Sequence, residues 1–404
     1  MRYDFTTIMD RHQKDAIAVD GPGTIPFAPK GPKDDFDVIP MWVADMNFPT
    51  APSIVDAIIE RAKHPAFGYF MPQKEYFDAI IGWQGRHNGV KGLEAKHIGY
   101  ANGVLTGVVA AANVLCSRGD NILVHSPTYV GFTHSLGDNG YNLVGSPLVL
   151  DDAGVWRMDY ADMEEKIKSM HIHCAVLCSP HNPCGRVWEQ WELEKAMELF
   201  RKYDVYVISD EIWSDLTLTG FKHIPTQSVS EDAKLRTVAV YAPSKTFNLA
   251  GLVGSYTIIY NDRLRDRVDK EISLSHANGM NVLSMHALMG AYLGDGDNWL
   301  SELRQVLTAN VDYACAFLAE HFEGVTVQKP QGTYMLFVDC TKWCEAHGKT
   351  IDELEDRLWS VGVTVQDGRQ FHGPCHIRMN LALPLSGVQE AFRRMDELVF
   401  NAEW

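Results

Sequence analysis

Short apolar runs that end in polar residues recur between residues 121 and 245, and they constrain the fold most strongly. The runs are NILVHSP (121–127), CAVLCSP (174–180), VYVISDE (205–211) and VAVYAPSK (238–245). Helical patterns such as GVLTGVVAAANVLC (103–116) lie between or beside them. Unbroken apolar runs of this length are typical of strands buried on both faces. The strand–helix–strand order therefore predicts an α/β fold with a mainly parallel sheet covered by helices.

The pattern changes at both ends of the chain, which predicts three parts. Residues 1–45 are rich in Pro, Gly and charge, and we expect an extended N-terminal arm that packs with a small domain. Residues 46–288 contain the strand–helix alternation and form the expected large domain. Residues 289–404 begin with a long helical pattern and continue with short strand-like runs, so we expect a smaller α+β domain.

Composition argues against some partners and favours a cytoplasmic location. The formal net charge is -16, which argues against binding to nucleic-acid backbones or anionic membranes. The N-terminal residues lack the apolar core of a signal peptide, and the most apolar segment (103–116) is too short to span a bilayer. The eight cysteines are dispersed along the chain, so we expect reduced thiols in the cytoplasm.

The segment HIHCAVLCSPHNPCGRVW (171–188) contains three histidines and three cysteines, which raises the question of a metal site. In a strand, Cys174 and Cys178 would lie on one face roughly 13 Å apart, too far to share one zinc ion. His171 and His173 would lie on the opposite face. We therefore expect no metal here, and interpret the cysteines as small core residues.

Three polar residues follow the ends of successive predicted strands. Asn182 lies in a tight turn, Asp210 ends VISD, and Lys245 follows VAVYAPS. Each has an ordinary interpretation, as a turn residue, a helix cap or a solvated lysine. Because ligands of open α/β sheets bind beyond the carboxyl ends of the strands, the three together favour a site. Asp210 could stay ionised against a buried cation such as a pyridinium, and Lys245 could form a Schiff base.

Other candidates are weaker when taken singly. The loop before the helical pattern at 103–116 could bind a phosphate at a helix N-terminus, although Gly is common there. Tyr129 could stack on an aromatic ring or simply pack in the core. Arg378, in the strand-like run IRMNLALP, could clamp a carboxylate or form a surface ion pair.

The order of these candidates resembles that of a known family. The similar segments run through nearly the whole chain: WVADMNF (42–48), GYF (68–70), NGV (102–104), SPTYVGF (126–132), CSPHNPCGRVW (178–188), SDEIWSDL (209–216), APSKTFNLAGL (242–252) and RMNLALP (378–384). They resemble pyridoxal 5'-phosphate (PLP) enzymes of the class I/II aminotransferase superfamily. More narrowly, they are similar to the MalY/PatB-type, cystalysin-like cystathionine β-lyases. The resemblance implies the PLP-dependent transferase fold type I, with a mainly parallel seven-stranded sheet in the large domain.

The resemblance implies roles around the cofactor ring. Lys245 would attach the cofactor, and Asp210 would pair with the pyridine nitrogen. Asn182 would bond the ring oxygen, and Tyr129 would stack on the ring. Trp213 occupies the position where many aminotransferases have a tyrosine and this subgroup often has a histidine, so it counts among the expected cofactor contacts.

The resemblance also implies how phosphate and substrate are held. Gly103, Val104, Leu105 and Ser244 would bind the phosphate. Tyr69 would reach the phosphate of a neighbouring subunit's cofactor, which makes a homodimer with shared sites the expected assembly. Arg378 would bind the carboxylate of an amino-acid substrate. Val253 and Ala242 replace an arginine and a serine that many relatives use for the phosphate, and Val130 replaces a second tyrosine of cystalysin.

The expected function is a PLP-dependent carbon–sulfur β-lyase that acts on cystathionine, cysteine or another S-substituted cysteine. An aminotransferase with the same residues is the first alternative, and a lyase with an added regulatory binding role is the second. A Rossmann dehydrogenase is disfavoured because no GxGxxG follows the first strand.

Overall fold

The computed structural model describes residues 1–33 and 35–404. Residue 34, inside the predicted N-terminal arm, lies outside the described residues. The chain forms two compact units: the larger comprises Thr50–Asn182 and Arg186–Ser301, and the smaller comprises Met1–Pro49, Pro183–Gly185 and Glu302–Trp404. The domain divisions expected after residues 45 and 288 remain predictions.

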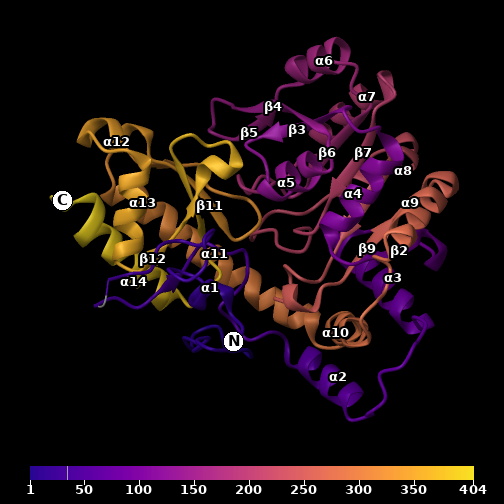
Figure 1. Ribbon diagram of the computed structural model, residues 1–404, viewed down its shortest axis with the longest axis horizontal. Coiled ribbons are helices and arrows are strands. Elements are labelled where there is room, and N and C mark those ends of the chain that lie inside the picture. The colour runs from indigo at the N-terminus through magenta and orange to yellow at the C-terminus, as the bar shows by residue number, and fades with distance from the viewer. Residues whose placement is uncertain (34) are drawn as a thin grey trace. The chain divides into compact units, whose positions relative to one another are not determined.

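The larger unit is built on one sheet with the strand order β2-β9-β8-β7-β6-β3-β4-β5 (Figure 1). Its strands are β2 (Ile98–Ala101), β3 (Asn121–Ser126), β4 (Asn142–Leu150), β5 (Trp156–Met158), β6 (Cys174–Cys178), β7 (Tyr206–Asp210), β8 (Thr237–Tyr241) and β9 (Ser255–Ile258). The central strands β8, β7, β6, β3 and β4 are parallel, whereas β9, β2 and β5 pair antiparallel. The predicted mainly parallel sheet is confirmed, and β5 adds an eighth strand at the edge beside β4.

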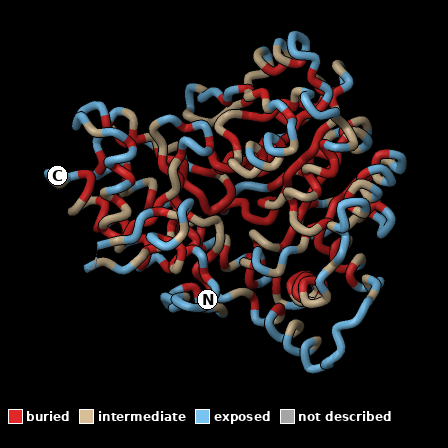
Figure 2. Tube along the Cα trace, viewed as in Figure 1, coloured by how far each residue is buried: buried red, intermediate tan, exposed pale blue. Residues whose placement is uncertain are grey.

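The sheet is buried because its central strands carry apolar residues on both faces. All residues of β6 and β8 are buried, as the red central tubes in Figure 2 show. One face packs against α4 (Val104–Leu115), α5 (Val130–Asp138) and α9 (Asp262–Leu274). In this core, Ala111 of α4 lies with Val176, Ile208 and Val240 of three neighbouring strands.

Further helices complete the larger unit. They are α2 (Pro52–Ala62), α3 (Lys74–Asn88), α6 (Tyr160–Ser169), α7 (Gln190–Lys202), α8 (Glu231–Arg236) and α10 (Val282–Leu293). Helix α10 packs against α2 and α3, while α7 contacts both α6 and α8. Short 3₁₀ turns occur at Ala95–His97, Thr226–Ser228 and Ala250–Leu252.

The smaller unit contains a four-stranded antiparallel sheet with the order β10-β11-β14-β13. Its strands are β10 (Thr326–Val327), β11 (Met335–Asp339), β13 (Gln366–Asp367) and β14 (His376–Asn380), and β1 (Ile39–Pro40) pairs parallel with β12 (Val363–Thr364). Its helices are α1 (Ile17–Asp20), α12 (Thr341–His347), α13 (Ile351–Ser360), α14 (Leu385–Met395) and most of α11 (Gly296–His321), with a 3₁₀ helix η4 (Gly368–Phe371). Strand β1 lies in the predicted arm, so the arm is paired with C-terminal residues through backbone hydrogen bonds.

Within the described ranges, no helix combines the length and apolar character needed to cross a bilayer.

Candidate active site

Three of the predicted site residues lie at or just beyond one edge of the central sheet. Strands β6 and β7 are parallel and pair Cys178 with Asp210, and β7 and β8 pair Asp210 with Val240. Asn182 and Lys245 follow the ends of β6 and β8 by a few residues. The parallel register thus brings three segments that are distant in sequence to the carboxyl edge of the sheet, where α/β folds bind ligands.

Asp210 is a buried carboxyl group with few partners. Its side chain is 3% exposed, and it accepts a hydrogen bond of 3.1 Å from the backbone N–H of Ile212. Burial raises the pKa of Asp210 to about 7, and the neighbouring Glu211 adds to this rise. The Ile212 hydrogen bond and the charge of Lys245 oppose the rise, so Lys245 is close enough to stabilise the carboxylate.

Lys245 lies beside the ring of Trp213, and the next residue, Thr246, is held by a side-chain hydrogen bond. Its Nζ is 5.7 Å from the centroid of the buried Trp213 ring. The following residue, Thr246, donates a hydrogen bond of 2.9 Å from Oγ1 to Asp215, which also accepts one of 3.1 Å from Trp83 Nε1. Asp215 therefore fixes the turn that carries Lys245. Sequence reasoning missed Asp215, although it lies in the same SDEIWSDL segment as Asp210 and Trp213.

Glu211 is a second residue that sequence reasoning missed. Its fully buried carboxyl group accepts hydrogen bonds from Ser209 Oγ at 2.9 Å and from Tyr241 OH at 2.6 Å. His223 Nε2 lies 2.7 Å from the same carboxyl group, and Thr226 donates its backbone N–H to it at 3.0 Å. Because Ser209 lies in β7 next to Asp210 and Tyr241 ends β8, this network holds together the strands that position Asp210 and Lys245.

A histidine joins the ends of β3 and β6. His181 is buried, and its Nε2–H donates to the carbonyl oxygen of Pro127 at 2.9 Å. Burial lowers the pKa of His181 to about 4, so the ring is neutral at pH 7. The adjacent Asn182 is also buried. The turn that carries Asn182 is therefore anchored to the loop that leads to Tyr129.

The predicted phosphate loop has the backbone of a helix N-terminus. Gly103 is the N-cap of α4 with φ of 87°, a conformation that side-chain-bearing residues rarely adopt. The preceding Asn102 donates its backbone N–H to Ala277 at 2.8 Å, which fixes the loop. Val104 and Leu105 are the first residues of α4, and the N–H groups of a first helical turn have no partner within their own helix. This loop can accept an anion.

Tyr129 immediately precedes α5, and its ring packs against Gly131 and Phe132 of that helix. The Tyr129 and Phe132 rings meet edge-on with centroids 5.4 Å apart. A Cβ at Gly131 would lie 2.3 Å from Cε1 of Tyr129, so only glycine allows the ring this position. Tyr129 is partly buried against the core of the larger unit, which leaves part of its ring for a ligand.

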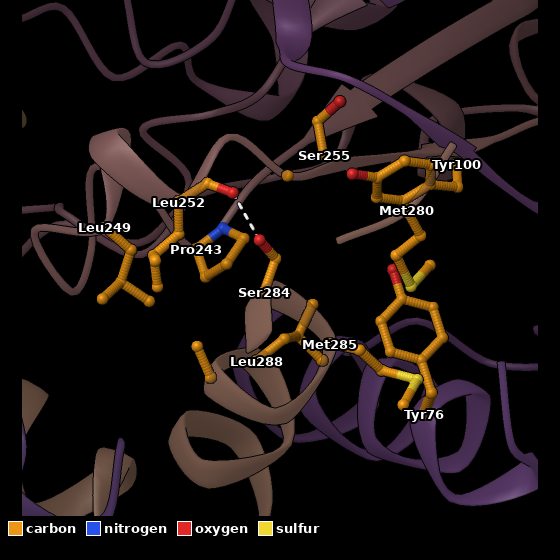
Figure 3. Close-up of a pocket in the computed structure, with 12 residues that line it drawn as sticks. Tyr76, Tyr100, Pro243, Leu249, Leu252, Ser255, Met280, Ser284, Met285 and Leu288 are labelled. Carbon is orange, nitrogen blue, oxygen red and sulfur yellow. Dashed lines mark hydrogen bonds between the residues drawn. The ribbon is translucent and has the colours of Figure 1, made fainter. Parts of the chain in front are cut away.

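Ser244 lies in the turn that follows β8, and the preceding residue, Pro243, lines a small pocket (Figure 3). Leu249 donates its backbone N–H to the carbonyl oxygen of Ser244 at 3.0 Å. The pocket is lined on one side by Pro243, Leu249 and Leu252, and Ser284 Oγ of α10 donates to the carbonyl oxygen of Leu252. On its other side lies Tyr100, whose hydroxyl donates to Asn102 at 2.9 Å.

Two predicted site residues, Tyr69 and Arg378, belong to other elements of the chain than those described so far. Tyr69 is fully exposed, in the loop between α2 and α3 that is pale blue in Figure 2. Arg378 belongs to β14 of the smaller unit and is 3% exposed. Its guanidinium group donates to the carbonyl oxygen of Trp42 at 3.3 Å and to Gln366 Oε1, and lies 4.3 Å from the Phe371 ring centroid.

The residues of the larger unit fit PLP. Asp210 is a buried carboxyl whose raised pKa favours its neutral form, and a pyridinium nitrogen would stabilise its ionised form. Lys245, within electrostatic reach, provides an amine for covalent attachment. The Gly103 loop offers backbone N–H groups to a phosphate. In the described part of the chain, no group of His, Cys, Asp and Glu residues is arranged to hold a metal ion.

Comparison with known proteins gives a consistent result. A family model for aminotransferase class I and II matches residues 37–395. The cystathionine beta-lyase PatB of Bacillus subtilis is 34% identical over 362 residues, which cover 89% of this chain and 92% of that protein. The protein MalY of Escherichia coli is 30% identical over 403 residues, which cover 96% of each.

A solved structure extends the similarity to the whole fold. The PLP-bound C-S lyase from Staphylococcus hominis superposes with a TM-score of 0.89 at 28% sequence identity, covering 99% of this chain and 98% of that one. The family and the fold that the motifs predicted are thereby confirmed. The chain belongs to the aminotransferase class I and II family.

Proposed function

We propose that the protein is a PLP-dependent carbon–sulfur β-lyase that acts on cystathionine, cysteine or another S-substituted cysteine. The observation that carries the proposal is the buried Asp210 carboxyl group with Lys245 in electrostatic reach, at the carboxyl edge of the sheet. The lyase names of PatB and of the Staphylococcus hominis enzyme support β-elimination over transamination. The eight cysteines are free thiols, which supports work in the reducing cytoplasm.

PLP, when bound, supplies an electron sink for the bond that breaks at the substrate Cα. Asp210, when ionised, would keep a proton on the ring nitrogen. Lys245 would attach the cofactor and, when its Nζ is free, would take the Cα proton. The electron pair of the Cα–H bond then expels a thiolate from Cβ, and water converts the remaining three-carbon fragment to pyruvate and ammonia.

Arg378 is the proposed partner of the substrate α-carboxylate. Its guanidinium group is buried against Phe371 and directed by Gln366 and the Trp42 carbonyl oxygen. A planar fork that is held in this way suits a carboxylate bound through two hydrogen bonds. Fixing the carboxylate would fix the direction of the Cα–H bond, on which proton removal depends.

A homodimer with shared sites is part of the proposal. Tyr69 and its neighbours Phe67 and Met71 expose large apolar side chains in one loop, at 111%, 55% and 84%. Such a cluster is typical of a surface that another protein covers. Sedimentation velocity should show a dimer. Tyr69→Phe should raise the PLP concentration required for half-maximal activity, and the variant should remain a dimer. A fully active monomer would contradict this part.

One experiment separates the lyase from the aminotransferase. The purified protein with PLP is incubated with cystathionine, with cysteine, and with an amino acid plus a keto acid. We expect pyruvate and thiol from the first two substrates, at rates well above amino-group exchange in the third. Faster exchange than pyruvate release would favour the aminotransferase and overturn the lyase assignment.

A further inference from the structure

Two turns of the larger unit carry the predicted cofactor residues, and one side-chain hydrogen bond joins them. The first turn follows Asp210, the last residue of β7, and includes Trp213 and Asp215. The second turn follows β8 and includes Lys245 and Thr246. Thr246 Oγ1 donates to Asp215 Oδ2 at 2.9 Å. This bond therefore links the segment after Asp210 to the residue next to Lys245.

The hydrogen bond between Thr246 and Asp215 lies in the protein interior. Thr246 is fully buried, and Asp215 is 7% exposed. Within residues 1–33 and 35–404, Asp215 forms no ion pair, so hydrogen-bond donors alone stabilise its carboxylate. A buried carboxylate that loses a donor is costly, because water cannot replace the lost bond. The folded protein should therefore keep this bond closed.

A second donor fixes the other oxygen of Asp215. Trp83 Nε1 donates to Asp215 Oδ1 at 3.1 Å. Trp83 is 1% exposed, and its ring stacks on Tyr292 with centroids 4.4 Å apart and 7° between the planes. Phe247, the residue after Thr246, meets the same indole at 5.6 Å. Because Trp83 cannot shift without displacing these rings, Asp215 is a fixed anchor for the second turn.

The backbone around Lys245 is held mainly by bonds within its own turn. Leu249, for example, donates its N–H to the carbonyl oxygen of Ser244 at 3.0 Å. Such bonds shape the turn, but they do not set its distance from the segment that follows β7. The bond from Thr246 to Asp215 does so, one residue away from Lys245.

We propose that Asp215 is a positioning residue, which holds Lys245 through Thr246 where its amine reaches the substrate Cα. This inference rests on the proposed function, in which Lys245 takes the Cα proton. Proton transfer requires hydrogen-bond reach, and a displacement of about 1 Å can lower a rate by about 100-fold. Loosening the turn should therefore slow proton removal. It should not weaken substrate binding, which the proposed function assigns to Arg378.

The test follows, by NMR in heavy water, the exchange of the Cα proton of L-alanine by the PLP-loaded protein. Alanine has no leaving group on Cβ, so exchange reports on the base in a lyase and in an aminotransferase alike. In Thr246→Val, which lacks the hydroxyl, kcat for exchange should fall by about 10- to 100-fold with KM within about twofold of wild type. Thr246→Ser keeps the hydroxyl and should restore kcat to within about threefold of wild type.

A second readout does not depend on turnover. The rate at which PLP attaches to the cofactor-free protein is followed by absorbance, and borohydride trapping locates the attachment at Lys245. Attachment should be slower in Thr246→Val and recover in Thr246→Ser, because the same amine has to reach the cofactor.

Variants of Asp215 distinguish its hydrogen bonds from its charge. Asp215→Asn loses the charge but can accept from Trp83 and donate to the Thr246 hydroxyl, so kcat should stay within about fivefold of wild type. Asp215→Ala loses both bonds and should be as slow as Thr246→Val. The double variant should be no slower than Asp215→Ala, because both changes break the same bond. If Asp215→Ala does not fold, the comparison of Thr246→Val with Thr246→Ser decides.

Ser146→Ala is the matched control. Ser146 of β4 is fully buried, and its hydroxyl donates to Asp162 of α6 at 2.6 Å, outside the group of predicted site residues. Its loss should leave kcat, KM and PLP attachment unchanged. Wild-type kcat in folded Thr246→Val, or an equal loss in Thr246→Ser, would overturn this proposal alone. Absence of exchange in the wild type would overturn the role of Lys245 itself, and with it the proposed function.

Discussion

Two buried carboxyl groups, one in each unit, differ in what surrounds them. Asp210 ends a strand of the larger unit, has a pKa raised to about 7, and is within electrostatic reach of Lys245. Glu355 lies on a helix of the smaller unit, has a pKa raised to about 8, and is surrounded mainly by other carboxylates. Both are desolvated acids that lack full compensation.

The comparison shows that the groups around a buried carboxyl, and not its raised pKa alone, indicate whether it belongs to an active site. Asp210 is fixed by a sheet register, and Lys245 lies within electrostatic reach of it, which supports its proposed place in the reaction centre. Glu355 accepts a hydrogen bond of 3.4 Å from Arg369 and lies near other carboxylates, so its raised pKa reflects burial and like charges, with no lysine beside it to attach a cofactor. A raised pKa is common to both, and only the neighbouring groups distinguish them.

The largest effect should come from removing the amine near Asp210. Lys245→Ala should reduce pyruvate release by at least about 1000-fold, since the base for Cα and the covalent attachment are lost together. Lys342→Ala, an exposed lysine of the smaller unit, should leave turnover unchanged. Stopped-flow pyruvate assays at saturating PLP measure both. Normal β-elimination by Lys245→Ala would show that Lys245 is neither the base nor the attachment point of the cofactor.

Substitution of Arg378 tests whether a residue of the smaller unit binds the substrate carboxylate. Arg378→Lys keeps the charge but loses the planar fork, so kcat/KM should fall by about 10- to 1000-fold. The loss should be similar for cystathionine and cysteine, because both carry the same carboxylate. Arg393→Lys, an exposed change on α14, is the matched control. Intact kcat/KM for both substrates in Arg378→Lys would show that the carboxylate is bound elsewhere.

The two raised pKa values predict a pH-dependent stability of the cofactor-free protein. Between the ordinary value of 3.8 and about 7, the unfolded chain has lost the Asp210 proton and the folded chain has kept it. The free energy of unfolding should therefore fall as pH rises, by at most about 1.4 kcal/mol per pH unit for one group. Glu355, whose ordinary value is 4.5, should extend the fall to about pH 8.

Urea unfolding from pH 4 to pH 9 measures these slopes. Asp210→Asn should reduce the slope between about pH 4 and pH 7 and leave the fall between pH 7 and pH 8, whereas Glu355→Gln should reduce the slope between about pH 4.5 and pH 7 and remove the fall between pH 7 and pH 8. Equal curves for the wild type and both variants would mean that neither carboxyl group is uncompensated in solution.

The sequence predicted the sheet and its polar edge because both follow from local patterns. Buried apolar runs mark β3, β6, β7 and β8, and the polar residues that follow them mark the carboxyl edge. The short antiparallel strands of the larger unit were not predicted. β5, for example, has three residues, Trp156–Met158, and is defined by its pairing with β4 rather than by its own composition.

Residues that act through long-range contacts were beyond sequence reasoning. Asp215 becomes informative only when Thr246 and Trp83, distant in sequence, donate to it. Glu355 has the helical spacing of an ordinary surface acid, and its burial depends on packing against segments from both ends of the chain. The roles of Tyr69 and Arg378 remain predictions that rest on the resemblance and on their exposure and contacts.

The smallest expected effect concerns substrate preference at the larger unit's site. Trp213 is buried with its ring centroid 5.7 Å from Lys245 Nζ, so a smaller ring there would open space beside the reacting amine. Trp213→His should lower kcat for every substrate by a common factor, because the contact with Lys245 is lost for all of them. The ratio of kcat/KM for cystathionine to that for cysteine should also change, by roughly three- to tenfold, since the two differ only in the group on sulfur.

The control for this change is Trp191→His, which alters a half-exposed indole on α7 outside the site. Its ratio should equal that of the wild type. Both variants should bind PLP with the absorption spectrum of the wild type, which separates a change in substrate contact from a loss of cofactor. A wild-type ratio in Trp213→His, at any overall rate, would show that the sulfur substituent does not reach this ring. The determinants of preference would then have to be sought at Val130, the first residue of α5.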